Sequence, residues 1–205
     1  MPLNDPLDES EANSVRFGWI APALAGCLTL GAGLIYAFGW LGDIWQLVRP
    51  TREAASLVPL TAFSFVMLGL ALMIHRAGGQ RDQVVSNALA LTTLALAVAN
   101  YAAILWGHAD GLSFLIPSES RVGDRMSPVT SFGMILAALA VLAVVQRRSL
   151  LSLSLAVFGI SAGICLIVLT TPDMTGNPLI SAMAGLSLYT EIGFVLLFTA
   201  IALDS

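Results

Sequence analysis

The stretch Ser127-Pro128-Val129-Thr130-Ser131-Phe132-Gly133-Met134 opens a long apolar segment of the chain. A serine that precedes a helix accepts hydrogen bonds from its first free N–H groups, and proline suits the first helical position because it has no N–H to leave unpaired. A threonine hydroxyl in the first turn can bond the backbone of that turn. The stretch therefore predicts a helix start, made by Ser127, Pro128 and Thr130.

Two other stretches repeat this pattern. One reads Val58-Pro59-Leu60-Thr61-Ala62-Phe63-Ser64-Phe65, and the second, a weaker copy, reads Ser187-Leu188-Tyr189-Thr190-Glu191-Ile192-Gly193-Phe194. Thr61, Thr130 and Thr190 align, and Pro59 aligns with Pro128. Because each copy leads into an apolar segment, the sequence predicts a repeated architecture of three helix–loop–helix hairpins.

The composition places these hairpins in a membrane. Hydrophobic residues make up 57% of the chain and charged residues 11%, whereas a soluble domain carries about 25% charged residues. The net charge of −4 argues against nucleic acid as a partner, because nucleic-acid binding needs clustered positive charge. All nine basic residues are arginines, so the chain offers no lysine for a retinal Schiff base.

A helix needs about 20 apolar residues to cross about 30 Å of hydrocarbon. Six segments approach this length: 17–41, 59–74, 84–106, 128–145, 150–170 and 180–203. The predicted fold is an all-α integral membrane protein with six transmembrane helices in three hairpins, at about 17–77, 82–147 and 149–205. Residues 1–16 form an acidic tail that we expect to be cytoplasmic.

Arginines indicate the orientation, because cytoplasmic loops are enriched in Lys and Arg. The short links after the second and fourth segments carry Arg76 with Arg81, and Arg147 with Arg148. With Arg16, that face holds five arginines against four on the other. We therefore expect both termini to lie in the cytoplasm.

Small residues recur four positions apart inside the segments, where they let helix backbones approach closely. The pairs are Gly33 with Ala37, Gly133 with Ala137, and Gly159 with Gly163. Packing within one chain is the favoured interpretation, and a homodimer contact through the last pair is the alternative. The oligomeric state stays open.

The sequence shows no catalytic constellation. It has no Gly-rich phosphate loop, no HExxH and no paired cysteine motif. His75 and His108 fall at opposite ends of the predicted helices, too far apart to ligate one haem together. Cys27 and Cys165 are predicted to be small buried side chains. We therefore expect a protein that is not an enzyme and that holds no metal.

Four residues are candidates for ligand binding: Glu191, Asn100, Tyr101 and Trp106. An acid within a span is a functional candidate by default, although the repeat places Glu191 within a turn of its helix start, where water and the helix dipole lower its cost. A buried amide such as Asn100 is also typical of helix–helix hydrogen bonds. The aromatic side chains at the same end are also typical of a headgroup-level belt. The sharper alternative is a pocket for a lipid, quinone or pigment headgroup. The belt residues are Tyr36, Trp40, Trp45, Tyr101 and Trp106.

The phrase Arg125-Met126-Ser127-Pro128-Val129-Thr130 resembles a signature of N-terminal multi-helix membrane sensor domains. These domains belong to bacterial signalling proteins of the histidine kinase and diguanylate cyclase type. The looser copy Pro59-Leu60-Thr61-Ala62-Phe63 and the continuation Leu68-Gly69-Leu70-Ala71-Leu72 are similar to the same family. The resemblance covers about residues 25–205 and implies a sensory or input role in the bacterial inner membrane.

Unlike members of that family, the protein is expected to carry no output domain after its last apolar segment. We expect either an input module without its transmitter or a small accessory or scaffold subunit of a larger membrane complex, in contact with lipid or pigment. A transporter ranks third, since no span carries a clear central charge or a mid-helix Gly/Pro break. Membrane lipid and a membrane protein are the expected partners.

Overall fold

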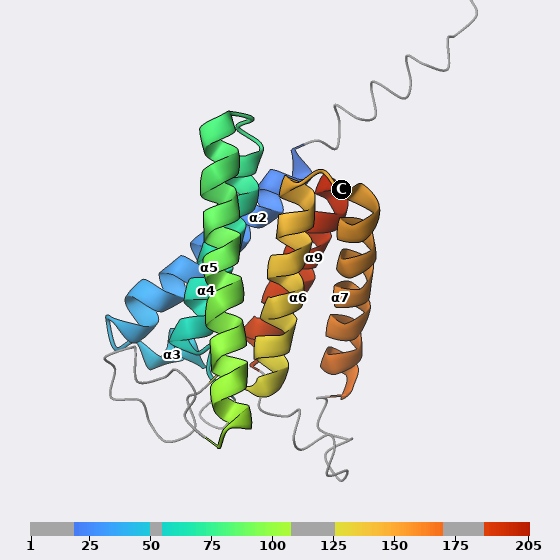
Figure 1. Cartoon of the computed structure of the whole chain (residues 1–205). Coiled ribbons are helices and arrows are strands. Elements are labelled where there is room, and N and C mark those ends of the chain that lie inside the picture. Colours follow the sequence, from blue (N-terminus) through green and yellow to red (C-terminus); the bar gives the residue numbers. More distant parts are fainter. Residues whose placement is uncertain (1–18, 50–54, 108–125, 170–186) are drawn as a thin grey trace, which may run out of the picture.

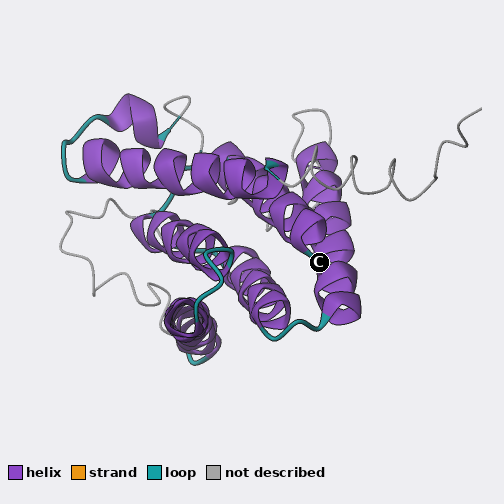
Figure 2. Cartoon of the chain, turned by 90° about the horizontal axis from the view of Figure 1, so that it is seen from above, coloured by secondary structure: helices purple, strands orange, loops and turns teal. Residues whose placement is uncertain are grey.

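The computed structural model describes residues 19–49, 55–107, 126–169 and 187–205, and every regular element in these ranges is a helix (Figures 1 and 2). The elements are α2 (Ile20–Leu34), the π-helical η1 (Ile35–Trp40), α3 (Trp45–Val48), α4 (Pro59–His75), α5 (Gln80–Leu105), α6 (Pro128–Val145), α7 (Ser149–Leu169) and α9 (Leu188–Asp204). The all-helical prediction is confirmed for this part of the chain.

Four helices are long and apolar enough to cross a membrane: Ile20–Trp40, Gln80–Leu105, Pro128–Val145 and Ser149–Val168. The helix α4 is apolar but shorter, with 17 residues, and α9 has the same length.

The helices pack as two nested sets. α4, α6 and α9 contact one another at the centre, and we call them the inner helices. Each outer helix fills a place between two of them: α2 packs on α4 and α9, α5 on α4 and α6, and α7 on α6 and α9. In Figure 1 the short links α4–α5 and α6–α7 lie at the same end of the bundle as the end of α9.

Several predicted boundaries move. The sixth segment was expected to be helical from Ile180, but Ser187 has extended backbone and α9 begins at Leu188. The predicted span reaching Trp106 ends one residue earlier, because Trp106 caps α5 from outside the helix. That same helix begins at Gln80, before the predicted Val84, because the side chain of Asp82 accepts a hydrogen bond from the Gly79 N–H at 2.9 Å.

The predicted link 42–58 contains structure of its own. The chain leaves α2 through η1 and forms α3. The indole of Trp40 is buried and donates to the Leu57 carbonyl oxygen at 2.8 Å, and its ring meets Trp45 edge-on with centroids 5.5 Å apart. Trp40 therefore holds the end of this link against the bundle through its hydrogen bond to Leu57. It does not stand in a headgroup belt, because its N–H has a partner inside the protein.

The prediction for the two cysteines is wrong. Cys27 and Cys165 are free and exposed, so they lie on the outer surface of α2 and α7 and not in the core. The acidic tail 1–16, His108 and Arg125 lie outside the described residues, as do the predicted first helical residue Phe17 and the start of the sixth segment at Ile180.

Candidate functional site

The three inner helices begin with related caps. Ser127 precedes α6 in extended backbone, and its Oγ accepts from the Thr130 N–H at 3.1 Å and lies 2.9 Å from the Thr130 hydroxyl oxygen. Ser187 and Thr190 repeat this arrangement at the start of α9, at 3.2 and 2.8 Å. At α4, Val58 offers no such side chain, and the start relies on Pro59 in the first turn. The serine and threonine hydroxyls occupy backbone donors that lipid could not satisfy.

Burial follows the same register in all three starts. The aligned threonines Thr61, Thr130 and Thr190 are buried, and so are the residues after them, Ala62, Ser131 and Glu191. The next aligned residues, Phe63, Phe132 and Ile192, are exposed. The aligned faces of the three helices therefore point the same way in the bundle.

Glu191 lies in the first turn of α9 and is only 3% exposed. Its position matches Ser131 on α6 and Ala62 on α4, two residues that are also buried. The positive end of the α9 dipole favours a carboxylate in this turn. A buried carboxylate thus stands at the end of the bundle where α4, α6 and α9 begin.

Asn100 crosses between helices near the same level. Its side chain on α5 is buried, and Nδ2 donates to the Ser131 hydroxyl at 2.8 Å and to the Met126 carbonyl oxygen at 3.3 Å. Ser131 in turn donates to the Ser127 carbonyl oxygen at 3.1 Å. These bonds fasten α5 to the start of α6, which is the structural role open to a membrane amide.

Tyr101 and Trp106 are placed differently from Asn100. Tyr101 is half-buried, and Trp106 is 81% exposed beyond the end of α5. Asn100 is hydrogen-bonded to α6, whereas the side chain of Trp106 is exposed on the surface. Among the described residues, the structure therefore does not bring the four ligand candidates into one pocket.

Below the caps, large side chains of one inner helix cover glycines of the next. A Cβ added to Gly193 on α9 would lie 2.7 Å from the Phe65 ring of α4, and one added to Gly133 on α6 would lie 2.6 Å from the Phe194 ring of α9. Phe65 and Phe194 also meet edge-on, with ring centroids 5.3 Å apart. Only a residue without a side chain fits beneath each ring. The role of Phe65, Phe194 and Gly193 was not predicted, although Gly193 aligns with Gly133 in the repeat.

The predicted small-residue pairs are placed as follows. A Cβ added to Gly159 would lie 2.5 Å from the Phe198 ring, and one added to Gly163 would lie 3.3 Å from a Val195 methyl. These glycines face α9. Gly33 lies near Val66 of α4, with 3.8 Å to a Cβ, while Ala37 is exposed. Ala137, the partner of Gly133, is fully buried.

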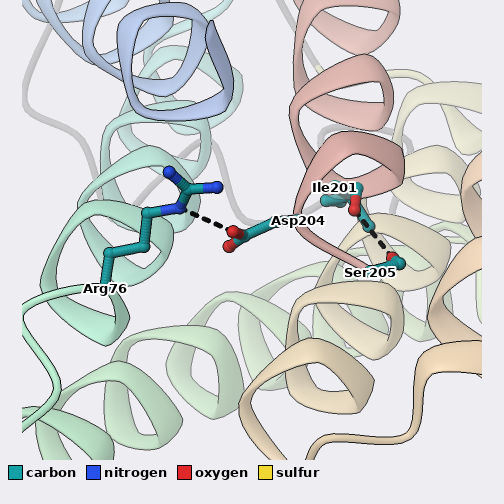
Figure 3. A network of polar contacts seen from close by, with 4 residues as sticks. All are labelled: Arg76, Ile201, Asp204 and Ser205. Carbon is teal, nitrogen blue, oxygen red and sulfur yellow. Dashed lines mark hydrogen bonds and ion pairs between the residues drawn. The ribbon is translucent and has the colours of Figure 1, made fainter. Parts of the chain in front are cut away.

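The opposite end of the bundle holds a second polar group that sequence reasoning missed. Arg76 at the end of α4 pairs with Asp204 at the end of α9, with 2.6 Å between Nε and Oδ1 (Figure 3). Beside this pair, the Ser152 hydroxyl donates to the Ser205 hydroxyl at 2.8 Å, and the latter donates to the Ile201 carbonyl oxygen at 2.7 Å. The signal was indirect: the repeat aligns the link after α4 with the end of α9.

Within the described residues, no three His, Cys, Asp or Glu side chains gather where they could hold a metal ion. No family model matches the chain, and neither a curated protein nor a solved structure matches it.

Proposed function

We propose that the chain is an all-α integral membrane protein whose six helices cross the bilayer as three repeated hairpins, α2–α4, α5–α6 and α7–α9. The packing of each hairpin's two helices against one another and the shared burial register of the three inner starts support this arrangement. A 17-residue helix such as α4 or α9 rises about 25 Å, near the lower limit for a span of about 30 Å.

The orientation belongs to the same proposal. Arg76, Arg147 and Arg148 lie in the links at the end of the bundle where the inner helices finish. An excess of arginine favours the cytoplasmic side. We therefore place this end, and both termini, on the cytoplasmic face of a bacterial inner membrane.

In this membrane, the protein acts as a non-catalytic sensory or input module. The observation that carries this proposal is the course of α9. It is one continuous helix with buried Glu191 in its first turn and Asp204, paired with Arg76 of α4, in its last. A displacement at the Glu191 end would reach the cytoplasmic end as a movement of α9 against α4. Closely packed helices respond in this way, by small shifts between discrete arrangements.

The test perturbs one end of α9 and measures the other. Spin labels at Ala77→Cys and Leu203→Cys, both exposed, report the α4–α9 separation in nanodiscs after Cys27 and Cys165 are replaced by Ala. Glu191→Gln should move the main peak of the distance distribution. The control Ile192→Ala changes an exposed neighbour and should leave the peak in place. An identical distribution for Glu191→Gln and the parent protein would refute the coupling.

An accessory subunit is the second candidate, and the outer apolar surface favours it. Large apolar side chains of the outer helices are exposed, among them Leu30 at 68% and Phe158 at 56%. Lipid or another membrane protein could cover them. Gentle extraction from the native membrane separates the two functions, because stoichiometric recovery within a large complex would support the accessory role and argue against the sensor.

A further inference from the structure

We propose that the end of the bundle where α4, α6 and α9 finish binds a phosphate-type oxyanion, held by Arg147, His75 and Ser149. This site lies at the opposite end of the inner helices from Glu191, and it does not depend on the sensory role.

The first support is a cavity of about 170 Å³ at this end. A single water needs roughly 10–15 Å³ of such space, so the cavity has room for an oxyanion. Its walls come from four helices and the α6–α7 link. The lining residues are His75, Val144, Arg147, Ser149, Ser152, Asp204 and Ser205.

The second support is a set of unused donors around this space. Among the described residues, the imidazole of His75, the guanidinium of Arg147 and the hydroxyl of Ser149 make no hydrogen bond or ion pair. The hydroxyls of Ser152 and Ser205, by contrast, are already bonded to each other and to backbone. Ser149 is also the first residue of α7, whose first-turn N–H groups have no partner within the helix.

The charges favour an anion. Arginine stays protonated in proteins and offers a planar fork of donors that matches phosphate. Asp204 also lines the cavity, but its carboxylate is engaged by Arg76, with 2.6 Å between Nε and Oδ1 (Figure 3). The guanidinium of Arg147 makes no ion pair with another described residue.

The backbone of Arg147 is the third support. Its φ is +56°, in the left-handed region that costs an L-residue free energy and that usually holds glycine at a helix end. The corresponding link after α4 does use glycine there, since Gly78 has a φ of +83°. An arginine in a position that usually holds glycine favours a use for its side chain, because strained backbone occurs preferentially at functional sites.

Binding is measured as the midpoint of thermal unfolding of the full chain in dodecyl maltoside, a detergent without phosphate, during titration with inorganic phosphate against chloride at equal ionic strength. Phosphate should raise the midpoint. Arg147→Gln should weaken the apparent affinity about tenfold, as expected for loss of one charge-assisted contact. The matched control Arg148→Gln removes the same charge from a neighbour that does not line the cavity, and should weaken it less than about twofold.

A second arm identifies the source of the oxyanion. Phosphatidylglycerol, added as mixed micelles, supplies a headgroup phosphate, and diacylglycerol supplies the same tails without phosphate. A midpoint rise that needs Arg147 and occurs only with phosphatidylglycerol assigns the site to a lipid headgroup, and one that occurs with inorganic phosphate assigns it to the free ion. Equal losses in Arg147→Gln and Arg148→Gln, or no rise with either probe, would overturn the site.

Arg147→Gly separates binding from folding. Glycine adopts the left-handed backbone without strain, so this variant should unfold at a higher temperature than the parent in the absence of phosphate, yet show no rise when phosphate is added. A variant that keeps the full phosphate response would contradict the role of the side chain.

Discussion

The two ends of the inner helices are built in opposite ways. Where α4, α6 and α9 begin, their aligned polar residues are buried. The rings of Phe65 and Phe194 pack there so closely on glycines of the neighbouring helix that no Cβ atom would fit between them. Where they end, Arg147 is exposed, Asp204 is only partly buried, and a cavity remains between the helices. The inner helices are therefore held together by close side-chain packing where they begin, which we call fixed by shape. Where they end they are held by an ion pair, and the cavity leaves room for a bound group.

Shape and charge have different energetic consequences in a membrane. Lipid tails are as apolar as the side chains, so inner packing stabilises a bundle through close contact and not through escape from water. A misfit between packed helices must then displace backbone. An ion pair that water reaches contributes little, with a typical range of about 0–1 kcal/mol. We therefore expect substitutions at the starts to cost more than substitutions at the ends.

The largest effect is expected for Gly133→Leu. A Cβ at this position would already lie 2.6 Å from the Phe194 ring, so the longer side chain must push α6 and α9 apart. The loss in free energy of unfolding should be at least about 3 kcal/mol, the upper end of the usual cost of overpacking. Dodecyl sulfate titration of the protein in mixed micelles measures it.

The matched control is Gly31→Leu on α2, since a Cβ on Gly31 would meet no atom within 4 Å. It makes the same chemical change within a helix on the open side of the bundle, and should alter the free energy of unfolding by less than about 1 kcal/mol. Comparable losses in the free energy of unfolding for Gly133→Leu and Gly31→Leu would contradict the view that close packing stabilises the helix starts more than the rest of the molecule.

Much of the tightly packed end could be predicted from sequence, because local chemistry dictates it. Ser127, Pro128 and Thr130 predict a helix start through capping rules that act within one turn, and the structure places them there. The repeat also placed Glu191 in a first turn. Which ring covers which glycine could not be predicted, since Phe65 and Gly193 lie far apart in the chain and meet only through packing.

The end of the bundle with the cavity was predicted less well, because its contacts also join residues that lie far apart in the chain. Arg76 and Arg147 were read as markers of orientation, which depends on composition alone. Arg76 pairs with Asp204 and Arg147 lines the cavity, and these separate roles depend on how the ends of four helices meet. The left-handed backbone at Arg147 leaves no sequence signal either, because a glycine is the usual sign of that conformation.

A smaller effect is expected for Asn100→Leu, which sharpens the comparison by testing charge-free polar contacts at the packed end. The change removes the donor to the Ser131 hydroxyl and the Met126 carbonyl oxygen. Side-chain hydrogen bonds between membrane helices contribute about 0.6 kcal/mol on average and up to about 1.7. We expect a loss of about 1–2 kcal/mol in the free energy of unfolding, measured in the same titration.

Asn87→Leu on the same helix is the control, because Asn87 is only half-buried and makes no hydrogen bond of this kind to another described residue. An equal loss for Asn87→Leu would show that the hydrogen bonds of Asn100 do not fasten α5 to α6.

The smallest effect is expected at the open end, for the ion pair of Arg76 and Asp204. A double-mutant cycle with Arg76→Gln and Asp204→Asn isolates the coupling free energy of the pair from the other effects of each change. The Arg76 side chain is 30% exposed and that of Asp204 is 11% exposed, so the coupling should be no more than about 1 kcal/mol. It should also fall as salt is raised from low to physiological concentration, since water and ions reach the pair.

The control cycle, Arg148→Gln with Asp204→Asn, should give a coupling free energy near zero, because Arg148 makes no ion pair in the described residues. A coupling above about 3 kcal/mol that ignores salt would mean that the ends are held as firmly as the starts, and the contrast between shape and charge along α9 would have to be abandoned.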